Sequence, residues 1–149
     1  MNYKDIKLEA TDGNTYALKD FKKKVVLFFY PKDNTPGCTT QAQEYTSYKE
    51  DFEKNNAIVV GVSRDSIKSH HKFIENKDLD LLLLSDANEE LSNALEVLQE
   101  KNMFGKKVFG IVRSSFIFDE EGNLIEEYRK VKAPGNAKAM LDRIIELNK

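Results

Sequence analysis

The stretch VVLFFYPKDNTPGCTTQA, residues 25–42, contains the features that decide the fold. Its first six residues are apolar on both faces and rich in β-branched and aromatic side chains, a pattern typical of a strand that is covered on both sides. Pro31 ends this strand. Thr35 is a suitable N-cap and Pro36 a suitable first helical residue. The stretch therefore predicts a central strand, a short loop, and a helix with Cys38 in its first turn.

Strands and helices are expected to alternate after this point. Cys38, Ala42, Tyr45 and Phe52 recur at helical spacing and predict an amphipathic helix over residues 38–54. The elements expected next are a buried strand at 57–63, a helix at 66–76 capped by Ser66, a strand at 81–84 and a helix at 89–98. Such alternation produces a parallel-rich sheet with helices on its faces.

The two ends of the chain add antiparallel elements. Residues 6–8 and 15–18 flank a turn and are expected to form a hairpin, as are residues 115–118 and 124–129 around Gly122. A last apolar helical face covers residues 137–145. We find no repeat or linker, so the sequence predicts one α/β domain over residues 1–149, with a mixed central sheet flanked by helices.

Composition excludes several classes of function. The net charge is −2 and no cluster of basic residues forms a footprint for nucleic acid. The longest apolar runs, 25–30 and 81–84, are far shorter than the ~20 residues that cross a bilayer, and the first ten residues do not resemble a secretory signal. A lone cysteine cannot form an internal disulfide, which favours a reducing compartment, by default the cytoplasm.

Cys38 is the candidate reactive group. The free N–H groups and the dipole of a helix N-terminus favour the thiolate over the thiol, and the thiolate is the form that attacks a peroxide to give a sulfenic acid. Helical periodicity directs the sulfur toward the sheet and away from bulk water. The alternative is that Cys38 is a small buried hydrophobe without reactivity.

The segment FYPKDNTPGCTTQA at 29–42 resembles the peroxiredoxins. Pro31, Thr35 and Cys38 match their Pro-x-x-x-Thr-x-x-Cys signature at the expected strand-to-helix junction. The resemblance is nearest to the bacterioferritin comigratory protein, or PrxQ, group and extends over nearly the whole chain. Further matches are Gly61-Val62-Ser63 with Asp65, Leu84-Ser85-Asp86, Gly105-Lys106-Lys107, and Arg113-Ser114-Ser115-Phe116 with Asp119 and Gly122.

The resemblance implies a thioredoxin-like fold with an N-terminal hairpin extension, and a thiol peroxidase that needs no metal and no organic cofactor. By position, Cys38 corresponds to the peroxidatic cysteine, Thr35 to a hydroxyl that contacts sulfur and peroxide, and Pro31 to a ring that shields them. Arg113 corresponds to the arginine that favours the thiolate and polarises the substrate. From the residues alone, Thr35 could be only a helix cap, Pro31 only a strand terminator and Arg113 only a surface charge.

The chain departs from many relatives at Gln43, where the resemblance implies a resolving cysteine five residues beyond the first. With one cysteine, the sulfenic acid must be resolved by an external thiol: a small thiol, a thioredoxin-like or glutaredoxin-like protein, or Cys38 of another molecule. Overoxidation then competes with recycling. The alternatives are a thiol-based redox sensor that relays oxidation to a partner, and a binding module in which Cys38 is merely packed.

The two histidines, the first turn of the helix after Cys38 and residues 103–104 also allow predictions. His70 and His71 lie in a polar helix without a metal-ligand pattern, so we expect both on the surface and no metal site. Thr39 and Gln41 are expected to be ordinary first-turn residues, although the Gln41 amide could help to hold the site. Met103 and Phe104 are expected to pack near the mouth of the active site. No apolar stripe is left over, which favours a monomer or a weak homodimer.

Overall fold

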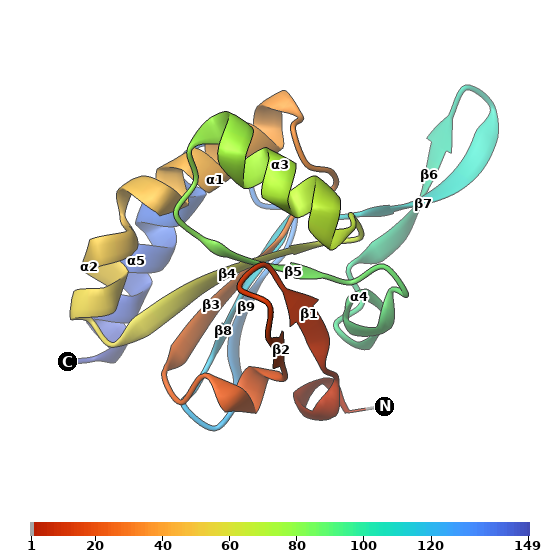
Figure 1. The fold of residues 1–149 in the computed structure, drawn as a ribbon. Coiled ribbons are helices and arrows are strands. Elements are labelled where there is room, and N and C mark those ends of the chain that lie inside the picture. Colours follow the sequence, from red (N-terminus) through yellow and green to blue (C-terminus); the bar gives the residue numbers. More distant parts are fainter. Residues whose placement is uncertain (1) are drawn as a thin grey trace.

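A seven-stranded mixed sheet forms the centre of the molecule in the computed structural model, which describes residues 2–149 (Figure 1). The strand order is β2-β1-β5-β4-β3-β8-β9, and a separate two-stranded hairpin consists of β6 and β7. The strands are β1 Leu8–Ala10, β2 Thr15–Tyr16, β3 Lys24–Phe29, β4 Ala57–Ser63, β5 Leu82–Ser85, β6 Leu98–Met103, β7 Lys106–Ile111, β8 Ser114–Phe118 and β9 Leu124–Tyr128. The helices are α1 Pro36–Ser47, α2 Lys49–Lys54, α3 Ile67–Lys77, α4 Glu90–Ala94 and α5 Asn136–Leu147, with the 3₁₀ turns η1 Tyr3–Asp5 and η2 Leu18–Asp20.

Strand β3 lies inside the sheet, as the sequence predicts. It pairs in parallel with β4 and antiparallel with β8, and its last five residues are buried. Side chains alternate along a strand, so Val26 and Phe28 point to one face while Leu27 and Phe29 point to the other. The mixed sheet expected from the pattern of elements is confirmed.

The two faces of the sheet bury separate apolar cores. The first core contains Tyr45, Phe52, Phe73 and Met140, so α1, α2, α3 and α5 cover that face together (Figure 1). The second core, on the opposite face, contains side chains of β1, η2 and α4 with Val97 and Ile111. Because one sheet separates both cores, displacement of β3 would disturb each of them.

The predicted helix over residues 38–54 differs from the observed one. Helix α1 begins at Pro36 with Thr35 as its extended N-cap residue, and it ends at Ser47, because the backbone angles of Tyr48, φ −101° and ψ 6°, are not helical. A second short helix, α2, then buries Phe52. The apolar spacing therefore predicted the correct buried face but not the break.

The helix predicted over residues 89–98 is wrong in its second half. Helix α4 stops at Ala94, and Glu96 has a left-handed backbone with φ +57°. The carbonyl oxygens of Leu95 and Glu96, which further helix would have used, accept hydrogen bonds from Arg129 instead. Leu95 and Val97 are buried all the same, so the apolar pattern was satisfied by a turn.

Strands β6 and β7 form a hairpin that projects from the body of the molecule (Figure 1). The sequence did not predict it. Phe104, in its turn, has a side chain that is 99 % exposed, so the prediction that Phe104 packs near the active site is wrong. The side chain of Met103 lies outside the part of the chain that is described.

The N-terminal hairpin exists but is shifted from its predicted limits. It joins β1 to β2, and β1 also pairs antiparallel with β5, which places the hairpin at one edge of the main sheet. Among residues 2–149, none of the helices has the length and apolar character required to cross a bilayer.

Candidate active site

Cys38 is the third residue of α1, directly after the loop that leaves β3. Its residue surface is only 1 % exposed, and it belongs to the core on the helical face of the sheet. Thr35 precedes the helix without capping it, since its hydroxyl donates to the carbonyl of Lys32 at 2.8 Å. The Thr35 side chain thus takes none of the first-turn N–H groups, which leaves that turn suited to a negative charge.

Arg113 lies between β7 and β8, 75 residues from Cys38 in the sequence, and the fold brings the two together. Its Nη2 donates to the Cys38 sulfur at 3.4 Å. A guanidinium cannot accept a hydrogen bond and is always charged, so this contact favours a thiolate. The alternative in which Arg113 is only a surface charge does not fit this position.

Gly37 allows the guanidinium to lie this close to the start of the helix. A Cβ atom built on Gly37 would lie 3.1 Å from Nη2 of Arg113, tighter than ordinary van der Waals contact. A larger residue at position 37 would push the guanidinium away from its present place beside the sulfur.

Gln41 holds the other side of the guanidinium. Nη1 of Arg113 donates to Oε1 of Gln41 at 2.6 Å, so the amide nitrogen of Gln41 faces the opposite way and donates to Oδ1 of Asn136 at 3.0 Å. Gln41 is fully buried and Asn136 is 5 % exposed. Gln41 is therefore one of the residues that hold the site rather than an ordinary first-turn residue.

Asn136 is the first residue of α5, and sequence reasoning missed it. Its Oδ1 also accepts hydrogen bonds from Tyr45 Oη at 2.6 Å and Ser115 Oγ at 2.8 Å. Burial raises the pKa of Tyr45 well above its usual value, so this hydroxyl remains a donor at neutral pH. One oxygen thus joins α1, β8 and α5 behind Arg113, and we call Gln41, Asn136, Tyr45 and Ser115 the amide network.

The remaining predicted residues lie in the loop between β3 and α1 and on α1 itself. Pro31 and Thr35 are half-buried at the two ends of the loop. Gln43 is exposed on α1, away from the buried face that carries Cys38. The structure therefore joins Cys38 to Arg113 by a direct contact and keeps Pro31 and Thr35 in the loop that leads to the sulfur.

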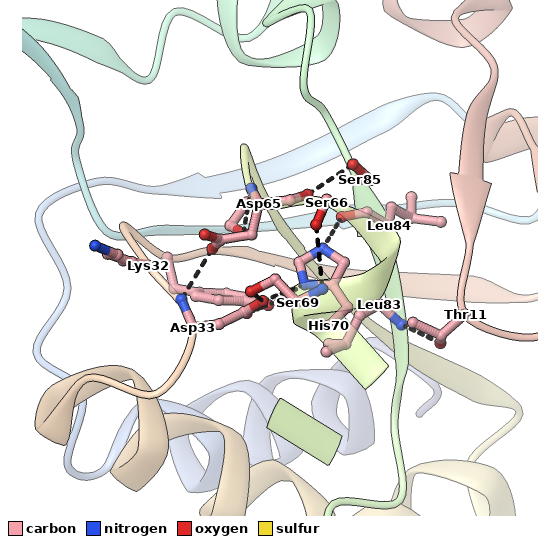
Figure 2. Close-up of polar contacts among 12 residues, drawn as sticks. Thr11, Lys32, Asp33, Asp65, Ser66, Ser69, His70, Leu83, Leu84 and Ser85 are labelled. Carbon is pink, nitrogen blue, oxygen red and sulfur yellow. Dashed lines mark hydrogen bonds and ion pairs between the residues drawn. The ribbon is translucent and has the colours of Figure 1, made fainter. Parts of the chain in front are cut away.

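A second buried network holds the middle of this loop (Figure 2). Asp33 accepts hydrogen bonds from Tyr30 Oη at 2.6 Å and Ser69 Oγ at 2.8 Å, and its Oδ2 lies 2.7 Å from Nδ1 of His70. The prediction that His70 is a surface residue is wrong, because its side chain is fully buried. Its spacing of three residues from buried Phe73 was the available signal. His71 is exposed as expected.

Asp33, Asp65 and His70 also have the composition of a metal site, with candidate ligand atoms within 4.8 Å of one another. Each of these ligand atoms already has a hydrogen-bonding partner in the protein. Oδ2 of Asp65 accepts from the backbone N–H of Asp33 at 2.8 Å and from Ser63 Oγ at 2.7 Å. A cation would have to displace these bonds, so we interpret the cluster as a hydrogen-bonded clamp on the loop.

Comparison with known proteins agrees with this geometry. The model of the AhpC/TSA family matches residues 2–127. The chain is 43 % identical to peroxiredoxin Bcp of Bacillus subtilis over 97 % of this chain and 92 % of that protein, and 46 % identical to peroxiredoxin Bcp of Xanthomonas campestris over 92 % and 86 %. A solved structure of the bacterioferritin comigratory protein of Xanthomonas campestris superposes on this chain with a TM-score of 0.93 at 39 % identity. The superposition covers 99 % of this chain and 94 % of that one, and the structure belongs to work on the alkyl peroxide reduction activity of that protein.

Proposed function

The chain belongs to the AhpC/TSA family and is a peroxiredoxin, a thiol-dependent peroxidase with a thioredoxin-like fold, and from this premise we propose that Cys38 is the sulfur that attacks the peroxide. The observation that supports this role most directly is the 3.4 Å contact between Arg113 Nη2 and the Cys38 sulfur. A buried sulfur without a cationic neighbour would have favoured the packed, unreactive alternative.

The proposed reaction transfers two electrons from sulfur to the peroxide. The Cys38 thiolate attacks one oxygen of ROOH, an S–O bond forms, and the O–O bond breaks. The departing oxygen leaves as RO⁻ and takes a proton to give ROH, or water when R is hydrogen, while Cys38 becomes a sulfenic acid. Arg113 supports this step because its charge lies where negative charge moves from sulfur to the leaving oxygen.

We assign Thr35 and Pro31 to the substrate side of the sulfur. The Thr35 hydroxyl, which donates to the carbonyl of Lys32, is the group expected to contact the incoming peroxide. Pro31 is half-buried at the start of the same loop and is expected to shield the reacting atoms from water. These two roles are carried over from the family's motif, and their geometry depends on the conformation of the loop.

An external thiol completes the proposed cycle, because the chain has no second cysteine. A thiol R′SH attacks the sulfenic sulfur and releases water, which leaves a mixed disulfide between R′S and Cys38. A second thiol then attacks that disulfide and frees the Cys38 thiolate. The reductant is a small thiol, a thioredoxin-like protein or a glutaredoxin-like protein. The substrates that we propose are hydrogen peroxide and organic hydroperoxides, the second by analogy with the alkyl peroxide activity of the Xanthomonas campestris relative.

We propose that residues 1–149 act as one domain, since both apolar cores lie against the same sheet. We further propose a monomer or weak homodimer in a reducing compartment such as the cytoplasm, on the basis of the single cysteine and the absence of a leftover apolar stripe in the sequence. Sedimentation of the reduced protein at several concentrations tests the oligomeric state, and a stable trimer or larger ring would contradict it.

Stopped-flow mixing of reduced protein with hydrogen peroxide and with an organic hydroperoxide tests the central assignment. Rapid loss of the Cys38 thiol, with turnover when an external thiol is added, is the expected result. Cys38→Ser should abolish both, and the midpoint for alkylation of Cys38 against pH should lie below about 8.5, the value for an ordinary thiol. Oxidation without turnover by any added thiol would favour the redox sensor, and an alkylation midpoint above that value would favour the packed, unreactive cysteine.

Repeated pulses of peroxide without reductant provide a second test. Because no internal thiol traps the sulfenic acid, excess peroxide should convert Cys38 to the sulfinic acid and inactivate the protein. Mass spectrometry should find two added oxygens on the peptide that contains Cys38. An activity and a thiol titre that survive many pulses would contradict the one-cysteine cycle.

A further inference from the structure

Both ring nitrogens of His70 have hydrogen-bonding partners, and the partner of Nε2 determines that this nitrogen is protonated. Nε2 lies 2.8 Å from the carbonyl oxygen of Leu84 on β5. A carbonyl oxygen only accepts, so Nε2 must hold a proton and donate. The side chain is fully buried, so water does not replace this bond.

The second nitrogen requires another proton between His70 and Asp33. Nδ1 lies 2.7 Å from Oδ2 of Asp33, whose side chain is 1 % exposed. Two lone pairs at this distance would repel each other, so a proton lies on Nδ1 or on the carboxyl group. The pair is therefore either an imidazolium with a carboxylate or a neutral imidazole with a carboxylic acid.

The donors around Asp33 favour the charged alternative. Tyr30 Oη and Ser69 Oγ both donate to this carboxylate, and hydrogen bonds to the ionised form stabilise that form. Burial, and after it the neighbouring Asp33 carboxylate, raise the pKa of Tyr30 well above its usual value, so the phenol keeps its proton. Asp65 is the other ionisable group in the cluster, and it contributes a second carboxylate within 4.8 Å.

The pair acts on the loop that carries the active-site residues. Asp33 is held at its side chain by Tyr30, Ser69 and His70 and at its backbone N–H by Asp65. The next residue, Asn34, has a left-handed backbone with φ +62°, a conformation that non-glycine residues seldom adopt. His70 thus connects β5 and α3 to Asp33, in the middle of the turn between Pro31 and Thr35 (Figure 2).

We propose that His70 is a positioning residue for the peroxidase reaction: as a buried imidazolium it clamps Asp33 and thereby fixes the loop from Pro31 to Thr35 beside the sulfur. This inference rests on the proposed roles of Thr35 and Pro31. His70 is not assigned any contact with substrate or with Cys38. The arrangement differs from the contact of Arg113, which acts directly on the sulfur.

The protonation state is tested by NMR of the reduced protein with ¹⁵N-labelled histidine. At pH 7, at which a free imidazole is mostly neutral, His70 should show two protonated ring nitrogens. His71, exposed on the same helix, is the internal reference. A single protonated nitrogen on His70 would overturn the imidazolium. This measurement does not depend on peroxidase activity, so it stands or fails separately from the proposed function.

The positioning role is tested by His70→Asn, with His71→Asn as the matched control. The Asn amide can still donate to Asp33 but cannot also reach the carbonyl of Leu84, so the clamp is loosened without removal of the donor. The rate of Cys38 oxidation by peroxide should fall about 10- to 100-fold, as expected when a contacting group is misplaced. The rate and pH midpoint of Cys38 alkylation should stay unchanged, because the contact with Arg113 is separate.

A second variant, His70→Leu, removes both hydrogen bonds and should lower the peroxide rate further if the protein folds. If His70→Leu does not fold, His70→Asn alone decides the matter. A folded His70→Asn protein with the wild-type peroxide rate would overturn the proposal. A parallel loss of peroxide and alkylation rates would do so as well, because it would indicate a general disturbance of the site.

Discussion

Two buried polar networks support the active site, one behind Arg113 and one around Asp33, and they differ in chemistry. The amide network behind Arg113 contains only uncharged groups, and it holds the guanidinium that touches the sulfur through Gln41. The clamp around Asp33 contains two carboxylates and a histidine, none of which has a hydrogen bond to Cys38 among the described residues. Among the described residues, Arg113 is the charged group that hydrogen-bonds to the sulfur, while the ionisable pair of Asp33 and His70 holds the backbone of the loop.

Of the substitutions that test this difference, replacement of Arg113 should produce the largest change in the peroxide rate. Arg113→Met removes the charge and the donor to the sulfur, so the rate of peroxide reaction should fall by about 10²- to 10³-fold. Arg113→Lys should recover only part of the rate, because one ammonium cannot donate to the sulfur and to Gln41 in the same fork geometry. Stopped-flow kinetics measures both variants, with Lys107→Met on the exposed hairpin as the control.

A wild-type rate in Arg113→Met would mean that charge beside Cys38 is not needed. The contrast between the two networks would then lose its chemical basis.

Substitution of Asn136 tests whether the amide network must be neutral. Asn136→Asp keeps an acceptor for Gln41, Tyr45 and Ser115 but adds a negative charge behind Arg113. We expect the free energy of unfolding to be largely kept. The peroxide rate should fall by about tenfold, because the added negative charge offsets the positive charge of the guanidinium and so weakens its stabilisation of the thiolate. Thermal unfolding and stopped-flow kinetics on the same samples separate the two effects.

Asn136→Ala is the companion variant. It removes the acceptor that three buried donors share and should lower the free energy of unfolding by about 1–3 kcal/mol. If Asn136→Asp and Asn136→Ala behave alike in both measurements, the oxygen of Asn136 has only a structural role.

An ion pair nearer the surface should contribute a smaller amount to stability, and this contribution should depend on pH. Glu126 on β9 accepts three hydrogen bonds from Arg143 on α5, and these bonds lower the pKa of Glu126 below its usual value of 4.5. A lowered native pKa adds stability that is present above the unfolded value and is lost as the pH falls through the native one. Glu126→Gln should therefore be slightly less stable than wild type at pH 7, and the difference should shrink as the pH falls through the native pKa of Glu126.

Urea unfolding at several pH values measures this difference. The peroxide rate at pH 7 should not change in Glu126→Gln, since neither residue of this pair hydrogen-bonds to the amide network in the part of the chain that the structure describes. A stability difference that grows toward acid would contradict the assigned direction of the pKa.

A substitution in the turn of the β6–β7 hairpin should change neither the stability nor the reaction rates. Phe104 is 99 % exposed, so Phe104→Ser should leave the free energy of unfolding within about 0.5 kcal/mol of wild type. The rates of peroxide reaction and alkylation should be unchanged as well. A slower reaction with a bulky organic hydroperoxide alone would show that the hairpin meets large substrates.

Local patterns were sufficient to predict the element that carries Cys38. Buried residues 25–30, the break at Pro31 and the cap position of Thr35 are all signals between near neighbours, and the structure places β3 and α1 accordingly. Arg113 was chosen only by resemblance, because nothing in its local sequence reports a contact across 75 residues. The contact itself is confirmed by the geometry.

The parts that could not be predicted depend on tertiary contacts. Asn136 reaches Gln41 across 95 positions, and His70 is buried because Asp33 and Leu84 supply partners for both ring nitrogens. The early end of α4 depends on a left-handed Glu96 and on Arg129, which lies on a distant segment. From sequence alone, a polar residue is predicted to be exposed, because its burial depends on hydrogen-bonding partners that only the fold brings close.

The outward direction of Gln43 has a consequence for the redox cycle. Two helical positions five residues apart lie on different sides of α1 and about 8–9 Å apart at their Cα atoms, farther than any disulfide spans without movement of the main chain. An enzyme with cysteines at both positions would have to melt the start of this helix in every turnover. A chain with Gln43 has no such obligation. Its helix can remain wound throughout catalysis, and the task of reaching a sheltered sulfur passes to the reductant.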